Sequence, residues 1–200
     1  VLRIISENAR KILPESKLII HLERSFDQAI YKEFLDQIVN KYHIDFDILG
    51  MSYYPCWHRS MNELFANSDM VQSRYKLATM IVEAAYPFTY EDYEEGKENA
   101  LVVNEKMVKE NNGIMEFPVS KEGQKQYFET LIKRSKEHNI EGIVYWEPLE
   151  RPVKDGKWAT KEGVDYFNGQ KRIYRNDWAN NCLVDYEGNL NPAFDAFKLD

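Results

Sequence analysis

Hydrophobic and polar positions alternate along this chain with two different periods, which separate helices from strands. Between residues 2 and 13 an apolar side chain recurs about every third or fourth position, a helical spacing, and Pro14 ends the pattern. The same spacing returns in three later segments. The expected helices span residues 2–13, 28–42, 60–76 and 121–137, with a short terminal helix from about Pro192.

Between these helices lie short, nearly continuous apolar runs, which are typical of strands buried on both faces of a parallel sheet. Long loops are expected from Ala84 to Pro118 and from Trp146 to a turn at residues 187–189. Strands alternating with helices predict an α/β fold with a parallel sheet. The expected strands are Leu18–Leu22, Phe46–Tyr53, Ala78–Glu83 and Gly142–Trp146.

Every expected strand ends in polar or aromatic side chains. In parallel α/β folds the carboxyl ends of the strands form one rim, where ligand sites lie. Strand ends are also polar simply because they meet water, so one such residue would say little. Four strands that deliver them together favour a single pocket. The residues are His21 and Glu23, Ser52 and Tyr53, Glu83, and Trp146 with Glu147.

The overall composition narrows the possible partners. The net charge is -7 and no Lys/Arg-rich run is present, which argues against nucleic acid and anionic membranes. No apolar run approaches the roughly 20 residues of a membrane span. The 13 Tyr, 10 Phe and 4 Trp fit either a large aromatic core or a sugar-binding groove. The two cysteines, Cys56 and Cys182, are expected to be free thiols.

Three segments at strand ends share a pattern with one known family, and two flanking segments extend the likeness over nearly the whole chain. Together they resemble the arabinogalactan endo-β-1,4-galactanases of glycoside hydrolase family 53. The strand-end segments are FDILGMSYYPCWH (46–58), MIVEAAYPFTYED (80–92) and GIVYWEP (142–148); the flanking ones are EFPVSKEGQKQYF (116–128) and NNCLVDYEGNLNPAF (180–194).

This resemblance implies a (β/α)8 barrel, of which residues 1–200 would be the C-terminal half of one catalytic domain, with strands five to eight. A whole barrel takes roughly 250 residues or more, so the first four strands are expected to lie outside this chain. The first residues lack the features of a signal peptide. The family nevertheless implies an extracellular, periplasmic or cell-surface location.

The family also implies the chemistry. Retaining glycosidases use two carboxyl groups about 5 Å apart, a nucleophile and an acid/base. Glu83 matches the family's nucleophile, and Tyr53 is expected to hydrogen-bond and orient it. The family's acid/base is a Glu preceded by Asn on strand four, outside this chain. The pair Asn104-Glu105 has the same two residue types, but it lies in the expected loop after strand seven and we interpret the match as chance. Because general acid catalysis typically contributes 10²–10⁴-fold, the chain alone is predicted to be inactive.

The resemblance assigns the other strand-end residues to substrate binding. Trp146 would form the floor under the cleaved sugar, and Glu147 would bind hydroxyl groups or orient its neighbours. His21 would touch the substrate or the pocket wall, and Ser52 lies beside it among the substrate-binding candidates.

Three further aromatic residues lie just beyond strand ends. Trp57 and Tyr86 could stack on sugar rings or pack in the core, and we include both among the substrate-binding candidates. Tyr54 fits packing and function equally well. The segment Glu23–Phe26 departs from the Asp or Asn and Trp of many relatives, so contacts with substrate there should differ.

No cofactor is expected. Some family members hold calcium in the loop after strand seven, and Glu95 and Asn99 could serve as ligands here. However, Lys97 stands where those members have His, and a cation cannot bind calcium. We therefore predict no metal site.

Three alternatives remain. The chain could belong to a related endo-glycanase, such as a mannanase or cellulase, or to a barrel that binds carbohydrate without cleaving it. It could also be a stable half-barrel that pairs with its missing half or with itself, because the outer strands would otherwise expose unpaired edges. The expected partner is β-1,4-galactan.

Overall fold

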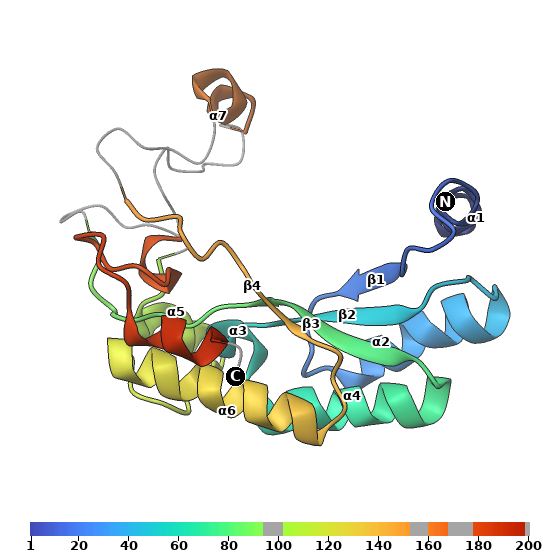
Figure 1. Ribbon diagram of the computed structural model, residues 1–200, viewed down its shortest axis with the longest axis horizontal. Helices are drawn as coiled ribbons and strands as arrows, with labels where there is room; N and C mark the ends of the chain where they lie inside the picture. Colours follow the sequence, from blue (N-terminus) through green and yellow to red (C-terminus); the bar gives the residue numbers. More distant parts are fainter. Residues whose placement is uncertain (94–101, 153–159, 168–177, 199–200) are drawn as a thin grey trace.

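A parallel sheet forms the centre of the computed structural model, which describes residues 1–93, 102–152, 160–167 and 178–198. The strands follow one another in the order β1-β2-β3-β4, and each pairs in parallel with the next (Figure 1). The α/β class and all four strands predicted from the sequence are confirmed. The strands are β1 Ile19–Leu22, β2 Ile48–Tyr53, β3 Ala78–Ala84 and β4 Ile143–Tyr145.

The helices also follow the predicted order. The expected helix over 28–42 runs as an α-helix and then as a π-helix. The described parts of the expected long loops hold three short helices that the pattern did not predict, α5, α7 and η3. The α-helices are α1 Leu2–Ile12, α2 Gln28–Leu35, α3 Pro55–His58, α4 Met61–Tyr75, α5 Glu105–Glu110, α6 Lys121–Glu137 and α7 Lys161–Phe167. The others are the π-helix η1 Asp36–Lys41 and the 3-10 helices η3 Ala179–Asn181 and η4 Pro192–Phe197.

Side-chain caps fix where the main helices begin. Ser60 and Glu63 form a reciprocal capping box at the start of α4. Asp27 accepts hydrogen bonds from the first backbone N–H groups of α2, and Ser120 accepts one from Gly123 in α6. These caps mark the first residues of α2, α4 and α6.

The main core lies between the sheet and the helices that cover one of its faces, with α4 and α6 lying along the sheet (Figure 1). Alternate residues of β2, namely Leu49, Met51 and Tyr53, point into this core and are fully buried. The intervening residues of β2 therefore face the opposite side. That side carries Ser52, the other strand-end residue of β2 singled out by the sequence, which pairs with Glu83.

The register between β2 and β3 shifts near their carboxyl ends. Met51 pairs with Ile81, but Ser52 pairs with Glu83, so that β3 has an extra residue, Val82, at this point. Bulges of this kind occur next to active sites, where they re-aim a side chain. Here the shift places Glu83 directly beside Ser52.

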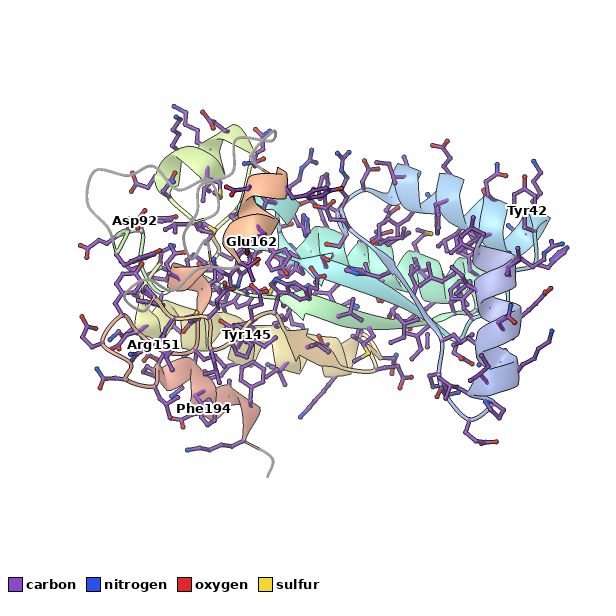
Figure 2. The ribbon with its side chains drawn as sticks, turned by 90° about the horizontal axis from the view of Figure 1, so that it is seen from above. Tyr42, Asp92, Tyr145, Arg151, Glu162 and Phe194 are labelled. Atoms are coloured by element: carbon purple, nitrogen blue, oxygen red, sulfur yellow. The ribbon has the colours of Figure 1, made fainter. Side chains whose placement is uncertain are left out.

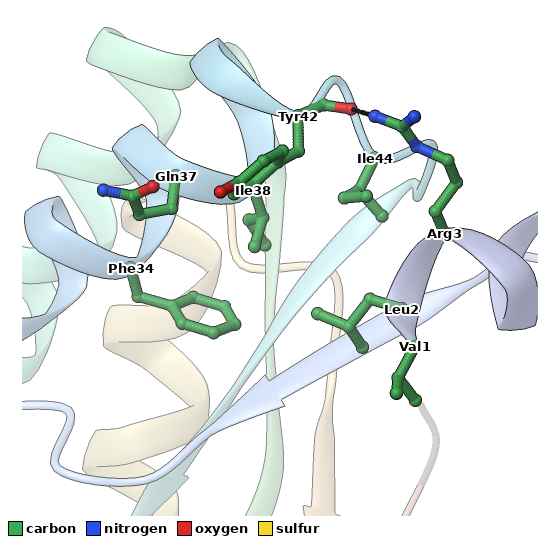
Figure 3. A pocket seen from close by; sticks show the side chains of 8 residues that line it. All are labelled: Val1, Leu2, Arg3, Phe34, Gln37, Ile38, Tyr42 and Ile44. Atoms are coloured by element: carbon green, nitrogen blue, oxygen red, sulfur yellow. Dashed lines mark hydrogen bonds between the residues drawn. The ribbon is translucent and has the colours of Figure 1, made fainter.

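The two ends of the molecule differ in character. Tyr42 and α1 lie at one end, whereas Asp92, Arg151 and, on α7, Glu162 lie toward the other (Figure 2). At the first end, α1 and the α2–η1 helix enclose an apolar pocket of about 470 Å³, with Arg3 bonded to the Tyr42 carbonyl at its edge (Figure 3). Ile44 of this pocket leads into β2, so the pocket lies at the opposite end of the sheet from Glu83.

Within the described ranges, every helix is too short or too polar to cross a lipid bilayer.

Candidate active site

Glu83 lies at the carboxyl end of β3, with its side chain 23% exposed. Its Oε2 accepts a hydrogen bond from the Tyr54 hydroxyl at 2.9 Å and one from the Ser52 hydroxyl at 3.2 Å. Its Oε1 lies 3.8 Å from Nδ1 of His21. The carboxylate is thus held on one oxygen while it remains open to solvent, as a nucleophile requires.

The tyrosine that holds Glu83 is Tyr54 and not Tyr53, which corrects the sequence prediction. Tyr53 points into the core, stacks on Tyr127 and donates its hydroxyl to the Arg59 carbonyl at 3.2 Å. Side chains alternate along a strand, and the backbone of Tyr54 is still extended. Ser52 and Tyr54 therefore share the face that carries Glu83, whereas Tyr53 faces the helices.

Tyr54 stays protonated as a hydrogen-bond donor. Burial raises the pKa of its phenol far above the usual value, and the negative charge of Glu83 raises it further. The ring is 6% exposed and leans edge-on against Trp57 and Trp178, with centroids 5.5 and 5.4 Å away. The hydroxyl is therefore fixed in place by ring packing as well as by its hydrogen bond.

Ser52 and His21 complete the surroundings of the carboxylate. Nε2 of His21 lies 2.6 Å from Oγ of Ser52, and Ser52 is 1% exposed. Neighbouring strands supply the three residues, so the parallel register brings His21, Ser52 and Glu83 together as predicted. Ser52 is buried and its hydroxyl bonds the carboxylate of Glu83, whereas the sequence placed it among the substrate-binding candidates.

Tyr54, which bonds Glu83, packs against Trp57 and Trp178, and we call these three rings the aromatic wall. Trp146 follows β4 and is 39% exposed, and the indole N–H of Trp178 donates to the Trp146 carbonyl at 3.2 Å. Trp57 packs against Trp178 with ring centroids 6.1 Å apart. Sequence reasoning missed Trp178 because it lies in a long loop, far from any strand end.

Tyr86 does not line this wall, contrary to expectation. It is fully buried, its ring stacks on Tyr127 with centroids 4.6 Å apart, and its hydroxyl donates to the Phe117 carbonyl. Tyr86 lies two residues past the end of β3, where the chain has already turned into the core. Its role is packing, the second of the two roles considered from the sequence.

Comparison with known proteins decides the family. The sequence model described as Glycosyl hydrolase family 53 matches residues 1–197. The chain belongs to glycosyl hydrolase family 53. Its four parallel strands and their helices form part of a (β/α)8 barrel and correspond to about half of a family 53 catalytic domain.

Individual relatives agree with this assignment. The chain is 33% identical over 162 residues to an arabinogalactan endo-beta-1,4-galactanase of Cellvibrio japonicus, covering 78% of this chain and 37% of that protein. It is 31% identical over 187 residues to an uncharacterized protein of Niallia circulans, covering 92% and 45%. The chain thus spans less than half the length of both relatives.

A solved structure supports the fold. The family 53 catalytic domain of Ignisphaera aggregans superposes with a TM-score of 0.77 at 24% identity, covering 96% of this chain and 49% of that one. At this level of identity the likeness concerns the fold, which is the arrangement expected from the sequence.

In this family 53 chain, the backbone holds Glu147 in an unusual conformation. Glu147 has a φ of 50°, in the left-handed region, and its side chain is exposed. Hydrogen bonds fix both sides of it, from the Trp146 N–H to the Ala84 carbonyl and from the Leu183 N–H to the Pro148 carbonyl. Such strain persists where surrounding structure enforces it, often at functional sites. The negative charge of Glu147 acts on the site, because it helps to raise the pKa of Tyr54.

Behind the site lies a histidine that the sequence did not single out. His58 is 1% exposed, and its Nδ1 lies 3.0 Å from the Ser52 carbonyl. Burial lowers the pKa of His58, although the negative charge of Glu23, 3.7 Å from Nε2, acts in the opposite direction. A neutral His58 therefore supports the backbone of Ser52, next to Glu83.

Among the described residues, no group of three or more His, Cys, Asp or Glu side chains could hold a metal ion. The calcium candidates Glu95 and Asn99, and Lys97 between them, lie outside the described residues. Asn104, whose neighbour Glu105 gave the coincidental pair, caps α5 by accepting a hydrogen bond from the Met107 N–H at 2.9 Å.

The two cysteines are free and buried, as expected. Burial raises the pKa of both thiols, Cys56 and Cys182, to about 12. At neutral pH they remain protonated and unreactive.

Proposed function

We propose that the protein carrying this chain is a retaining, endo-acting glycoside hydrolase that cleaves β-1,4-galactan of plant cell walls. The observation that carries the proposal is the setting of Glu83, a carboxylate at a barrel strand end with two donors on one oxygen. Membership of family 53 and the name of the Cellvibrio relative support the substrate class and favour it over mannan or cellulose.

In the proposed reaction, Glu83 attacks the anomeric carbon and forms a covalent glycosyl-enzyme, which water then hydrolyses. The carboxylic acid that protonates the leaving oxygen comes from outside these 200 residues, which form the C-terminal half of the catalytic barrel. It stands about 5 Å from Glu83, as in other retaining enzymes. Without it, the chain alone is inactive.

Substrate contacts in this proposal come from the aromatic wall and the strand ends. Trp146 is exposed enough to stack under the sugar at the point of cleavage, with Trp57 further along the groove. Glu147 and the edge of His21 accept or donate hydrogen bonds to sugar hydroxyls. Because a cell-wall polymer cannot enter the cell, the enzyme acts outside the cytoplasm.

The test compares two substitutions in the full-length protein that carries this chain. Glu83→Gln keeps the shape and hydrogen bonding of the side chain but removes the nucleophile, so galactan hydrolysis should fall by about 10³-fold or more. Glu105→Gln, at the exposed start of α5, is the matched control and should leave hydrolysis unchanged.

Three results would contradict the proposal in different ways. Undiminished hydrolysis by Glu83→Gln would refute the nucleophile. Cleavage of mannan or cellulose but not of unbranched galactan would refute the substrate. Binding of galactan by the unsubstituted protein without cleavage would identify a carbohydrate-binding barrel instead.

A further inference from the structure

The two oxygens of Glu83 have unequal surroundings. Oε2 accepts two hydrogen bonds, from Tyr54 at 2.9 Å and from Ser52 at 3.2 Å. Nδ1 of His21 lies 3.8 Å from Oε1, which is too far for a hydrogen bond. Of the two oxygens, Oε1 therefore accepts fewer hydrogen bonds from the protein and has its lone pairs more available.

The hydrogen bonds behind Oε2 have a definite direction. Ser52 has one hydroxyl proton, and it donates that proton to Glu83. The 2.6 Å contact between Ser52 and His21 then requires Nε2 of His21 to be the donor. The result is a hydrogen-bond relay that runs from His21 through Ser52 to Glu83, in which each hydrogen bond polarises the next.

The fold holds the residues of this hydrogen-bond relay in place. Ser52 and Glu83 are register partners on neighbouring strands, and Ser52 is 1% exposed. His58 holds the Ser52 carbonyl from behind. The Ser52 hydroxyl is thus shielded from water and has the two partners named above.

We propose that Ser52, backed by His21, is a positioning residue that holds Oε2 of Glu83, makes Oε1 the attacking oxygen and favours release of the carboxylate when the glycosyl-enzyme breaks down. This inference rests on the proposed function, because it assumes that Glu83 is the nucleophile.

The chemistry has two steps. In the first, a bond forms between Oε1 and the anomeric carbon while the glycosidic bond breaks, and a carboxylic acid outside this chain gives its proton to the leaving oxygen. In the second, water attacks the anomeric carbon, the bond to Oε1 breaks with its electron pair returning to Glu83, and the same outside group takes the proton from water.

Oε2 changes character between these steps. It is a carboxylate oxygen in the free enzyme and an ester carbonyl oxygen in the intermediate. Hydrogen bonds to an ionised acceptor are roughly twice as strong as those to a neutral one. The Ser52 donor therefore stabilises the released carboxylate more than the ester, and its loss should slow the second step more than the first.

The test uses the full-length protein and an aryl β-1,4-galactobioside with a good leaving group. For Ser52→Ala we expect steady-state kcat to fall about tenfold, with a rapid burst of released aryl alcohol close to one equivalent per enzyme. Intact-mass spectra taken during turnover should show more galactobiosyl-enzyme than in the unsubstituted protein.

Two further variants separate positioning from packing. Ser52→Thr keeps the hydroxyl and suits a strand, so it should restore fast breakdown of the intermediate. His21→Gln keeps a side-chain N–H and should accumulate less intermediate than His21→Phe. A purely structural role for Ser52 would instead slow both steps equally and raise KM without a burst.

The inference is overturned if Ser52→Ala shows no accumulation, or if Ser52→Thr fails to reduce it. Failure of the proposed function gives a different result, because the unsubstituted protein would then form no adduct on Glu83. An adduct on Glu83 in the unsubstituted protein, without accumulation in Ser52→Ala, refutes only the role of Ser52.

Discussion

At the scale of single residues, two adjacent tyrosines have opposite surroundings. Tyr54 bonds the Glu83 carboxylate at 2.9 Å, whereas Tyr53 is buried against the helices and bonds the Arg59 carbonyl. The two-residue period of a strand is enough to separate a site residue from a core residue. Substitution of each by Phe removes one hydroxyl and little else.

We predict that Tyr54→Phe lowers kcat on galactan about tenfold or more with little change in KM, because it removes a hydrogen bond to a charged group. Tyr53→Phe is the matched control: kcat should stay near normal, and the free energy of unfolding should fall by about 1 kcal/mol. Steady-state kinetics and thermal unfolding of both variants measure this. A large loss of kcat in Tyr53→Phe, with kcat near normal in Tyr54→Phe, would instead assign the orienting role to Tyr53.

The sequence predicted part of this site. His21, Ser52 and Glu83 could be grouped because strand ends of a parallel sheet share one rim. The choice between Tyr53 and Tyr54 could not be made, because it depends on where β2 ends and which face each residue takes. Trp178 could not be found, since long loops carry no periodic pattern that places their side chains.

At the scale of elements, the start of α6 requires a glycine. A Cβ on Gly123 would lie 1.8 Å from the Pro118 carbonyl oxygen, a backbone atom that cannot move aside easily. The next residue, Gln124, is fully buried and donates to the Tyr86 and Cys182 carbonyls at 2.7 and 2.9 Å. The close approach at Gly123 therefore fixes the position of Gln124, through which α6 bonds both the segment after β3 and the C-terminal segment.

We predict that Gly123→Ala lowers the free energy of unfolding by roughly 1–3 kcal/mol, as overpacking does in a tightly packed region. Gly142→Ala is the control, since a Cβ there would meet only the flexible end of Met80, at 3.3 Å. Denaturant unfolding of both variants measures the difference. Equal stability of the two would show that the Pro118 turn relaxes freely.

The elements themselves were largely predictable. Continuous apolar runs marked all four strands, because strands buried on both faces leave little room for polar residues. The short helix α5 was missed inside the expected loop over 84–118, because six residues give too few turns for a periodic pattern. The bulge at Val82 was also beyond prediction, since it arises from pairing with β2.

At the scale of the whole molecule, the sheet has two outer strands. Ile19 on β1 and Val144 on β4 are each 43% exposed, and α1 exposes Ile4, Ile5 and Ile12. Unpaired strand edges and apolar patches promote association with another chain. In a complete barrel such edges are paired.

We therefore predict that the 200-residue chain, produced alone, elutes in size-exclusion chromatography above the position of its 23.7 kDa monomer or aggregates. Mixing it with a separately produced N-terminal part of the same protein should shift it into a one-to-one complex and restore galactan cleavage. A monodisperse 23.7 kDa monomer would contradict the half-barrel interpretation.

The central claim is that Glu83 is the nucleophile of a retaining hydrolase. The most direct test treats the full-length protein with a 2-fluoro galactobioside that has a good leaving group. The fluorine slows both formation and breakdown of the glycosyl-enzyme, whereas the good leaving group speeds formation only, so the intermediate accumulates. Proteolysis and mass spectrometry then locate the label. We predict one label per enzyme, on the peptide that contains Glu83. A label on Glu147 or another carboxylate, or galactan turnover with no label at all, would contradict it.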